Sequence, residues 1–159
     1  MGNGILEIIN DKFHNYPNLF KAYSQIRENI EDYFKIKFSC KYFPYGFLEF
    51  INVYDGAELG EIKFYSITSD GKDKSPLLFK DYTNDEAVAE FTKNFAMGSN
   101  DSRILFFAQD DRGGRYFFKK DIQDDRVFYQ NSNNTDAVMI WDGFYDLLLD
   151  IINNIISNA

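Results

Sequence analysis

The sequence is most informative at Ile104-Leu105-Phe106-Phe107-Ala108-Gln109-Asp110-Asp111-Arg112-Gly113-Gly114-Arg115-Tyr116-Phe117-Phe118, where two apolar runs rich in β-forming residues flank a turn. The pair Gly113 and Gly114 suits a tight hairpin, because glycine adopts the backbone angles that such turns need. The pair lacks the spacing of a phosphate-binding loop, and a strand rather than a helix follows it. This stretch therefore predicts two antiparallel strands joined by a short hairpin.

Four short β-like runs fill the second half of the chain. They are residues 103–109, 115–119, 126–130 and 137–141. Turn-forming residues dominate the segments between them, and these segments are too short for the crossover that a parallel connection requires. The runs therefore predict an antiparallel meander. An exposed edge strand such as residues 126–130 could pair with a second copy of the chain, so we expect a monomer or a weak homodimer.

Helical periodicity dominates the first half and the end of the chain. Apolar residues recur at three- and four-residue steps over residues 19–34 and predict a helix there, and a shorter run over residues 5–9 is compatible with a preceding helix. Another helix is predicted from Pro44 to the pair Asp55-Gly56. Asp142 is the expected N-cap of a final helix, whose strong apolar stripe should pack across one face of the sheet.

The middle of the chain contains one further strand and one further helix. Residues 61–69 switch to the period of a strand, which Asp70-Gly71 would end. Residues 72–82 have no clean periodicity and are interpreted as a loop or irregular edge. Thr83-Asn84-Asp85-Glu86 matches a capping box, so a helix is predicted from there to Gly98.

Length and composition fit one α+β domain over residues 1–159, with a mainly antiparallel mixed sheet flanked by helices. The formal net charge of -8 argues against nucleic acid and anionic membrane surfaces as partners. Apolar runs stay well short of the roughly 18 residues that cross a bilayer. Cys40 is the only cysteine, so no intramolecular disulfide can form, and we expect a cytoplasmic protein.

The chain carries few residues suited to catalysis or metal binding. His14 is the only histidine, and it lies where the pattern indicates an exposed helix end, so a Ser-His-Asp or Cys-His system is not expected. A structural zinc site uses more ligands than His14 and Cys40 supply. Cys40 itself is interpreted as a small hydrophobic residue. We therefore expect no enzyme activity, no cofactor and no metal.

The most prominent polar groups are the pairs Asp110-Asp111 and Asp124-Asp125, each in a predicted hairpin turn. Two adjacent turns could place these carboxylates on one edge of the sheet. Three interpretations remain open: local turn chemistry, recognition of Lys and Arg on a protein partner, and divalent-cation or acid/base work. For a protein-partner interface, the expected acidic rim consists of residues placed in exposed turns, namely Asp55, Glu58, Asp110, Asp111, Asp124 and Asp125.

Three blocks of sequence follow one another in a recognisable order. They are Phe43-Pro44-Tyr45-Gly46-Phe47-Leu48-Glu49-Phe50 leading to Tyr54-Asp55-Gly56-Ala57, then residues 104–118, then Val127-Phe128-Tyr129 followed by Trp141-Asp142-Gly143-Phe144-Tyr145-Asp146-Leu147-Leu148. Together they resemble the SUKH superfamily, which includes the yeast cell-wall assembly regulators and many bacterial immunity proteins, over roughly residues 40–156. Arg115 departs from the acidic residue that family members often carry after the turn glycine.

The resemblance implies a SUKH-like fold and a protein-binding role without catalysis. The leading hypothesis is an immunity protein that binds one cognate toxin domain, such as a cationic nuclease, and blocks its active site. The alternative is a regulatory scaffold of the cell-wall-regulator type that binds endogenous proteins, with a small-molecule sensor as a variant. An enzyme ranks third.

Overall fold

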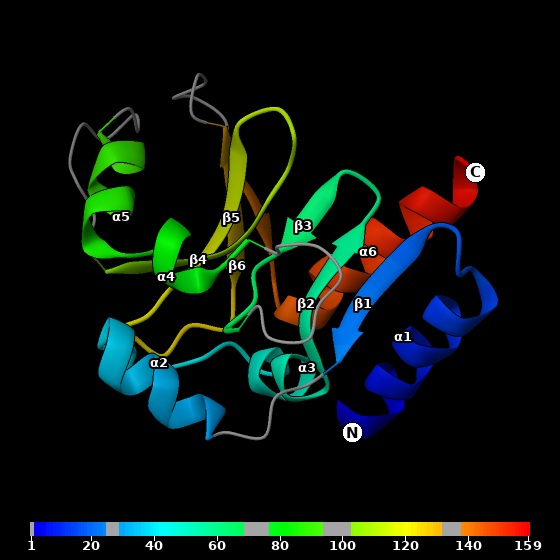
Figure 1. Ribbon diagram of the computed structural model, residues 1–159, viewed down its shortest axis with the longest axis horizontal. Helices are drawn as coiled ribbons and strands as arrows, with labels where there is room; N and C mark the ends of the chain where they lie inside the picture. Colours follow the sequence, from blue (N-terminus) through cyan, green and yellow to red (C-terminus); the bar gives the residue numbers. More distant parts are fainter. Residues whose placement is uncertain (1, 25–28, 69–76, 94–102, 132–137) are drawn as a thin grey trace.

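One antiparallel sheet organises the fold. The computed structural model describes residues 2–24, 29–68, 77–93, 103–131 and 138–159. Within these residues seven strands pair in chain order, each antiparallel to the next (Figure 1). The strands are β1 (Phe20–Ser24), β2 (Tyr54–Leu59), β3 (Ile62–Phe64), β4 (Ile104–Gln109), β5 (Gly114–Lys119), β6 (Val127–Asn131) and β7 (Val138–Trp141). The predicted four-strand meander is confirmed as β4 to β7.

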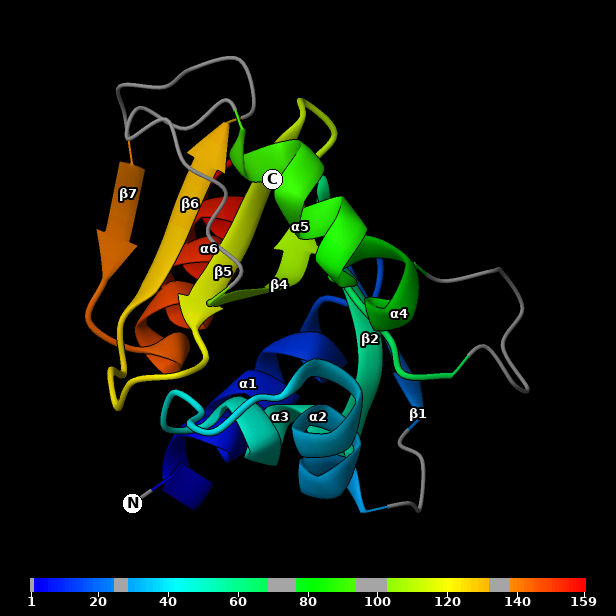
Figure 2. The same ribbon diagram turned by 90° about the vertical axis from the view of Figure 1, so that its left-hand side faces the viewer.

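Helices flank this sheet, which confirms the predicted α+β class. They are α1 (Gly2–Asn15), α2 (Ile30–Phe38), α3 (Phe47–Val53), α4 (Phe79–Tyr82), α5 (Asp85–Thr92) and α6 (Phe144–Ser157). Phe91 of α5 packs on Phe106 of β4, and Phe144 of α6 packs on the next strand residue, Phe107. Successive strand residues point to opposite faces, so α5 and α6 cover opposite faces of the sheet (Figure 2). The final helix therefore lies where the sequence predicts it.

The core is built mainly from aromatic rings around α3. Phe47 is fully buried, and its ring contacts the rings of Phe34 on α2, Phe118 on β5 and Phe144 on α6 at centroid distances of 5.5, 5.0 and 5.4 Å. Edge-to-face ring pairs of this kind add to the free energy gained by burying apolar area. Through Phe47, α3 thus links α2 and α6 to the sheet.

The prediction of one helix over residues 19–34 is wrong. Its first part is the strand β1, which pairs with β2, and α2 begins only at Ile30. Asn29 caps α2, because its side chain accepts a hydrogen bond from the Asp32 N–H at 3.2 Å. The apolar spacing of the segment matches one helix, but pairing with a strand about 35 residues further along overrides that local pattern.

The helix predicted from Pro44 to Asp55-Gly56 is present as α3, but it ends before that pair. α3 ends at Val53 and runs directly into β2, which contains both residues. The strand predicted over residues 61–69 is shorter, ending at Phe64, and its expected stop at Asp70-Gly71 lies outside the described residues. β2 itself escaped prediction because its sequence combines a helix-ending signal with few β-branched residues.

Several predicted element ends are shifted. The N-cap of α5 is Asn84 rather than Thr83, whose hydroxyl instead accepts a hydrogen bond from Phe106 N–H at 2.8 Å. The N-cap of α6 is Gly143 rather than Asp142. The stretch predicted as a loop contains the short helix α4, and the helix end expected at Gly98 lies outside the described residues. Residues 126–130 are not an edge strand, because β7 pairs with them and forms the edge.

Candidate functional site

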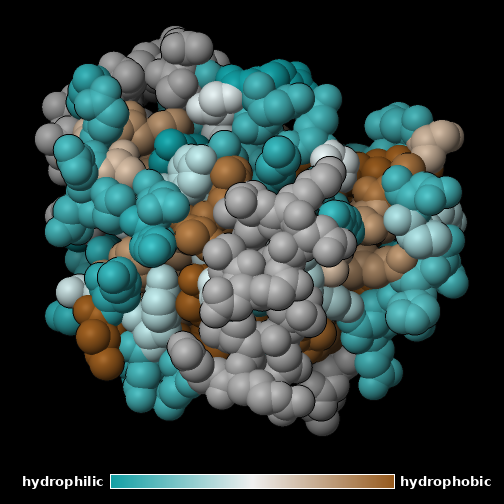
Figure 3. Space-filling view, viewed as in Figure 1, coloured by the Kyte–Doolittle hydropathy of each residue, from teal (hydrophilic) through white to brown (hydrophobic). Residues whose placement is uncertain are grey.

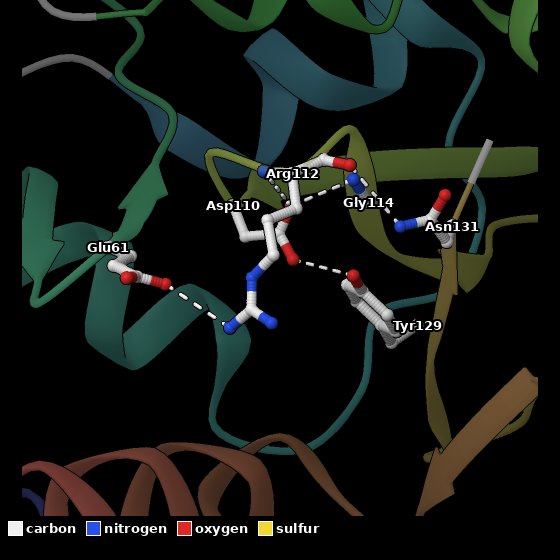
Figure 4. Close-up of polar contacts among 6 residues, drawn as sticks. All are labelled: Glu61, Asp110, Arg112, Gly114, Tyr129 and Asn131. Carbon is white, nitrogen blue, oxygen red and sulfur yellow. Dashed lines mark hydrogen bonds and ion pairs between the residues drawn. The ribbon is translucent and has the colours of Figure 1, made fainter. Parts of the chain in front are cut away.

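The turn that joins β4 to β5, residues 110–113, is held from within by Asp110. One carboxylate oxygen accepts hydrogen bonds from Arg112 N–H at 3.0 Å and Gly114 N–H at 2.8 Å. The other accepts a hydrogen bond from the Tyr129 hydroxyl on β6 at 2.5 Å (Figure 4). Asp110 is therefore an Asx-turn residue, so the local-turn interpretation holds for it.

The neighbouring strands hold the same turn in place. Asn131 on β6 donates its side-chain amide to Arg112 C=O at 3.3 Å (Figure 4). Gly113 has a φ of 88°, in the region that favours glycine. A Cβ on Gly114 would collide with the Tyr129 hydroxyl, so only glycine lets the two strands approach this closely. The hairpin predicted from the Gly-Gly pair is thus a tight turn held by hydrogen bonds that involve Asp110, Tyr129 and Asn131.

The side chains at the tip of this turn face solvent. Asp111 is exposed, and the Arg112 side chain is 77% exposed. Arg112 Nη2 lies 3.3 Å from Glu61 Oε2, which belongs to the β2–β3 turn (Figure 4). Exposed ion pairs of this kind stabilise a fold by only about 0–1 kcal/mol. These charges are therefore available to a partner at little cost to the fold.

A hollow of about 450 Å³, here called the α6-end cavity, adjoins the turn. Its lining residues come from the β2–β3 hairpin, the β4–β5 turn, β5 and the last turn of α6, and they are Leu19, Leu59, Gly60, Glu61, Ile62, Asp110, Arg112, Tyr116, Asn154, Ile155, Asn158 and Ala159. Figure 3 shows hydrophobic surface between the β2–β3 turn and α6, rimmed by hydrophilic residues. Burial raises the pKa of Tyr116 well above its usual range, so its hydroxyl stays protonated at neutral pH.

Two residues of the expected acidic rim are not in exposed turns. Asp55 is fully buried, and its carboxylate accepts hydrogen bonds from Ile67 N–H at 2.6 Å and Thr68 N–H at 3.3 Å. Glu58 lies within β2 and accepts a hydrogen bond from the Tyr23 hydroxyl at 2.9 Å. The placement of both residues in exposed turns is wrong, because the segment around Asp55-Gly56 is a strand and not a helix-ending loop.

The two aspartate pairs do not share one edge of the sheet. Asp110 and Asp111 lie between β4 and β5, whereas Asp124 and Asp125 lie between β5 and β6. Consecutive turns of a meander fall at opposite ends of the strands, so the two pairs lie apart (Figure 2). Of these four aspartates, the structure brings only Asp110 to the lining of the α6-end cavity.

Both members of the second pair have structural partners. The Asp124 carboxylate accepts hydrogen bonds from the Arg126 guanidinium, from Nε–H at 3.0 and 3.2 Å and from Nη2–H at 2.8 Å, and these lower the pKa of the Asp124 carboxyl. Asp125 is exposed and accepts a hydrogen bond from Tyr45 N–H at 3.0 Å. Asp125 therefore ties the β5–β6 connection to the turn before α3.

Among the described residues, His, Cys, Asp and Glu side chains form no group of three or more suited to holding a metal ion. His14 is exposed near the end of α1. Cys40 is 1% exposed, and burial raises the pKa of its thiol to about 12, so it is not an activated nucleophile. No helix in the described part of the chain has the length and apolar character of a membrane span.

A scan against protein-family models finds none that matches this chain, and a search of curated proteins finds no match either. The resemblance to the SUKH superfamily therefore stays a prediction from the order of sequence motifs. Glu61, Tyr129 and the end of α6 were not predicted as parts of the site. These residues come close to the β4–β5 turn only through strand pairing and helix packing, which local sequence patterns do not predict.

Proposed function

We propose that this protein is a non-catalytic protein-binding module and that it neutralises a cognate toxin domain as an immunity protein. The observation that carries the proposal is the ordered β4–β5 turn, in which Asp110 accepts three hydrogen bonds while Asp111 and Arg112 are exposed. A surface that is ordered before binding loses little conformational entropy when a partner docks.

The α6-end cavity supports the same proposal. Protein interfaces concentrate their binding energy in a few apolar or aromatic anchors that enter pockets, with polar residues around them. Leu59, Ile62 and Ile155 line the cavity together with the charged residues Glu61, Asp110 and Arg112. The net charge of -8 favours a cationic partner, because long-range attraction raises the association rate.

The proposal is tested by finding whether a neighbouring gene encodes a toxin domain and by asking whether this protein rescues cells that express such a domain. We expect the protein to protect these cells. Asn158→Trp, which places a bulky ring at the mouth of the α6-end cavity, and Asp111→Asn should each weaken toxin binding about tenfold or more. Asp32→Asn, an exposed change on α2, is the matched control and should leave protection intact. Failure of the unaltered protein to protect would refute the immunity role.

The electrostatic part of the proposal has its own test. Raising ionic strength should slow association with the toxin domain far more than it speeds dissociation, because screening acts on the long-range attraction. Stopped-flow or surface-plasmon-resonance measurements over a salt series give both rates. An association rate that is indifferent to salt would remove the role of the acidic charge.

A further inference from the structure

The edge strand β7 carries exposed apolar side chains. Val138, Met139 and Ile140 are 44, 54 and 53% exposed. β6 pairs with β7 on one side, and no described strand pairs with it on the other (Figure 2). In an antiparallel ladder every second residue turns its N–H and C=O away from the neighbouring strand. Within the part of the chain that the structure describes, β7 therefore presents backbone groups without a strand partner, together with apolar side chains.

The opposite edge of the sheet carries protective features that the described residues of β7 lack. β1 contains Lys21, its pairing with β2 shifts register between Ala22 and Ser24, and α1 packs beside it. A lysine, an irregular register and a covering helix are the usual devices against pairing with another chain. β7 consists of Val138, Met139, Ile140 and Trp141, without a charge, a proline or a register shift.

Exposed acidic side chains follow this edge strand in the sequence, at its junction with α6. Asp142, Asp146 and Asp150 are exposed along the junction of β7 with α6, and Trp141 Nε1–H donates a hydrogen bond to Asp150 at 3.2 Å. Residues 121–159 contain seven Asp and Glu but one Arg or Lys, a net charge of -6 out of the -8 of the chain. That one cation, Arg126, is paired with Asp124 at 2.8 Å.

These charges decide which occupant suits the edge. A second copy of the chain would bring its own acidic cluster against this one, and like charges facing each other disfavour pairing. An extended segment that carries Lys or Arg would instead place its cations near Asp142, Asp146 and Asp150. Backbone hydrogen bonds would supply affinity, while the charges and the exposed apolar side chains would supply selectivity.

We propose that β7 is a docking edge for an extended, Lys- or Arg-bearing segment of a partner protein, which adds to the sheet as a further strand. The proposal rests on the proposed function in one respect, since the occupant belongs to a protein partner. β7 and the β4–β5 turn are separate surfaces, so each can be tested without the other.

Trp141 provides the readout, because it is the only tryptophan and lies on β7 itself. The probe is a synthetic heptapeptide that alternates lysine with valine, added to the full chain while Trp141 emission is followed. One control peptide has the same sequence with alternate backbone nitrogens methylated along one edge, which blocks strand pairing but keeps the charge. Another replaces every lysine with glutamate. We expect saturable binding of the first peptide only.

Variants locate the binding. Met139→Lys places a like charge on the edge and should weaken peptide binding about tenfold or more. Ile36→Lys, at an 84% exposed site on α2, is the matched control and should bind as the unaltered protein does. Thermal melts check folding. Should Met139→Lys fail to fold, the double change Asp142→Asn with Asp146→Asn replaces it and should also weaken binding about tenfold.

Three results would overturn the proposal. The first is no saturable change in Trp141 emission, and the second is equal binding of the methylated peptide. The third is concentration-dependent self-association that Met139→Lys abolishes, which would make a second copy the occupant. Asp111→Asn should leave peptide binding unchanged. The peptide assay therefore tests the β7 proposal, and the toxin-rescue assay separately tests the proposed function of the β4–β5 turn.

Discussion

At the scale of single residues, two aspartates hold loops by accepting backbone hydrogen bonds. Asp55 receives the N–H groups of Ile67 and Thr68, and Asp110 receives those of Arg112 and Gly114. A carboxylate that accepts several backbone N–H groups is a structural element and not a free charge for a partner. Among the described hydrogen bonds, Asp111 accepts none from the backbone. Its exposed carboxylate is therefore the one in this turn most suited to binding a protein partner.

This difference predicts that replacing aspartate by asparagine lowers stability at Asp55 but hardly changes it at Asp111. Asp55→Asn should lower the free energy of unfolding by about 1–3 kcal/mol. The side-chain NH₂ group takes the place of one carboxylate oxygen, so a buried backbone N–H loses its hydrogen-bond acceptor. Asp111→Asn should change it by less than about 0.5 kcal/mol. Urea unfolding followed by circular dichroism measures both. Equal stability of the two variants would show that the Asp55 contacts do not support the fold.

Sequence reasoning found the turn residues of the candidate site but not their partners. Asp110 and Asp111 could be selected because turn chemistry is local. Tyr129 and Glu61 lie about 20 and 50 residues away along the chain and meet the turn only in the folded sheet. Glu58 and Asp55 were misplaced for the same reason, since their surroundings come from the distant strand β1 and from residues 67 and 68.

At the scale of elements, short-range patterns succeed where the contacts are short-range. β4 to β7 follow one another along the chain, so runs of β-forming residues separated by turn-forming residues predicted all four strands. β1 and β2 pair across α2 and α3, and a single helical pattern concealed β1. Long-range aromatic contacts position the elements relative to one another. The ring of Phe47 on α3, for example, packs against rings on α2, β5 and α6.

Removal of that ring should therefore destabilise the whole fold. Phe47→Ala is expected to lower the free energy of unfolding by about 3–5 kcal/mol, since a large cavity would remain among several rings. Ile36→Ala, at an exposed position on the neighbouring helix α2, should cost less than about 0.5 kcal/mol. Chemical unfolding of both variants gives the comparison. A small effect of Phe47→Ala would mean that the core can collapse around the missing ring.

At the scale of the whole molecule, burial keeps several weak acids protonated. Burial raises the pKa of Cys40 and Tyr129 to about 12, and a hydrogen bond to Asp110 contributes for Tyr129. Burial likewise raises the pKa of Tyr65, Tyr116 and Tyr145 well above the usual range of tyrosine. In the unfolded chain these groups ionise near their ordinary pKa values, about 8.5 for cysteine and about 10 for tyrosine.

This difference predicts a loss of stability in alkali. Below about pH 8.5 both states keep these protons, so the stabilisation is fully present. As pH rises from there to about 12, the unfolded chain releases protons that the folded chain retains, and unfolding becomes more favourable by up to about 1.4 kcal/mol per pH unit for each group. Urea midpoints at pH 8, 9.5 and 11 measure the decline, and ultraviolet absorbance separates tyrosine ionisation from it. Cys40→Ala should make the decline between pH 9 and 10 shallower. Stability that stays constant from pH 8 to 11 would contradict the burial of these hydroxyl and thiol groups.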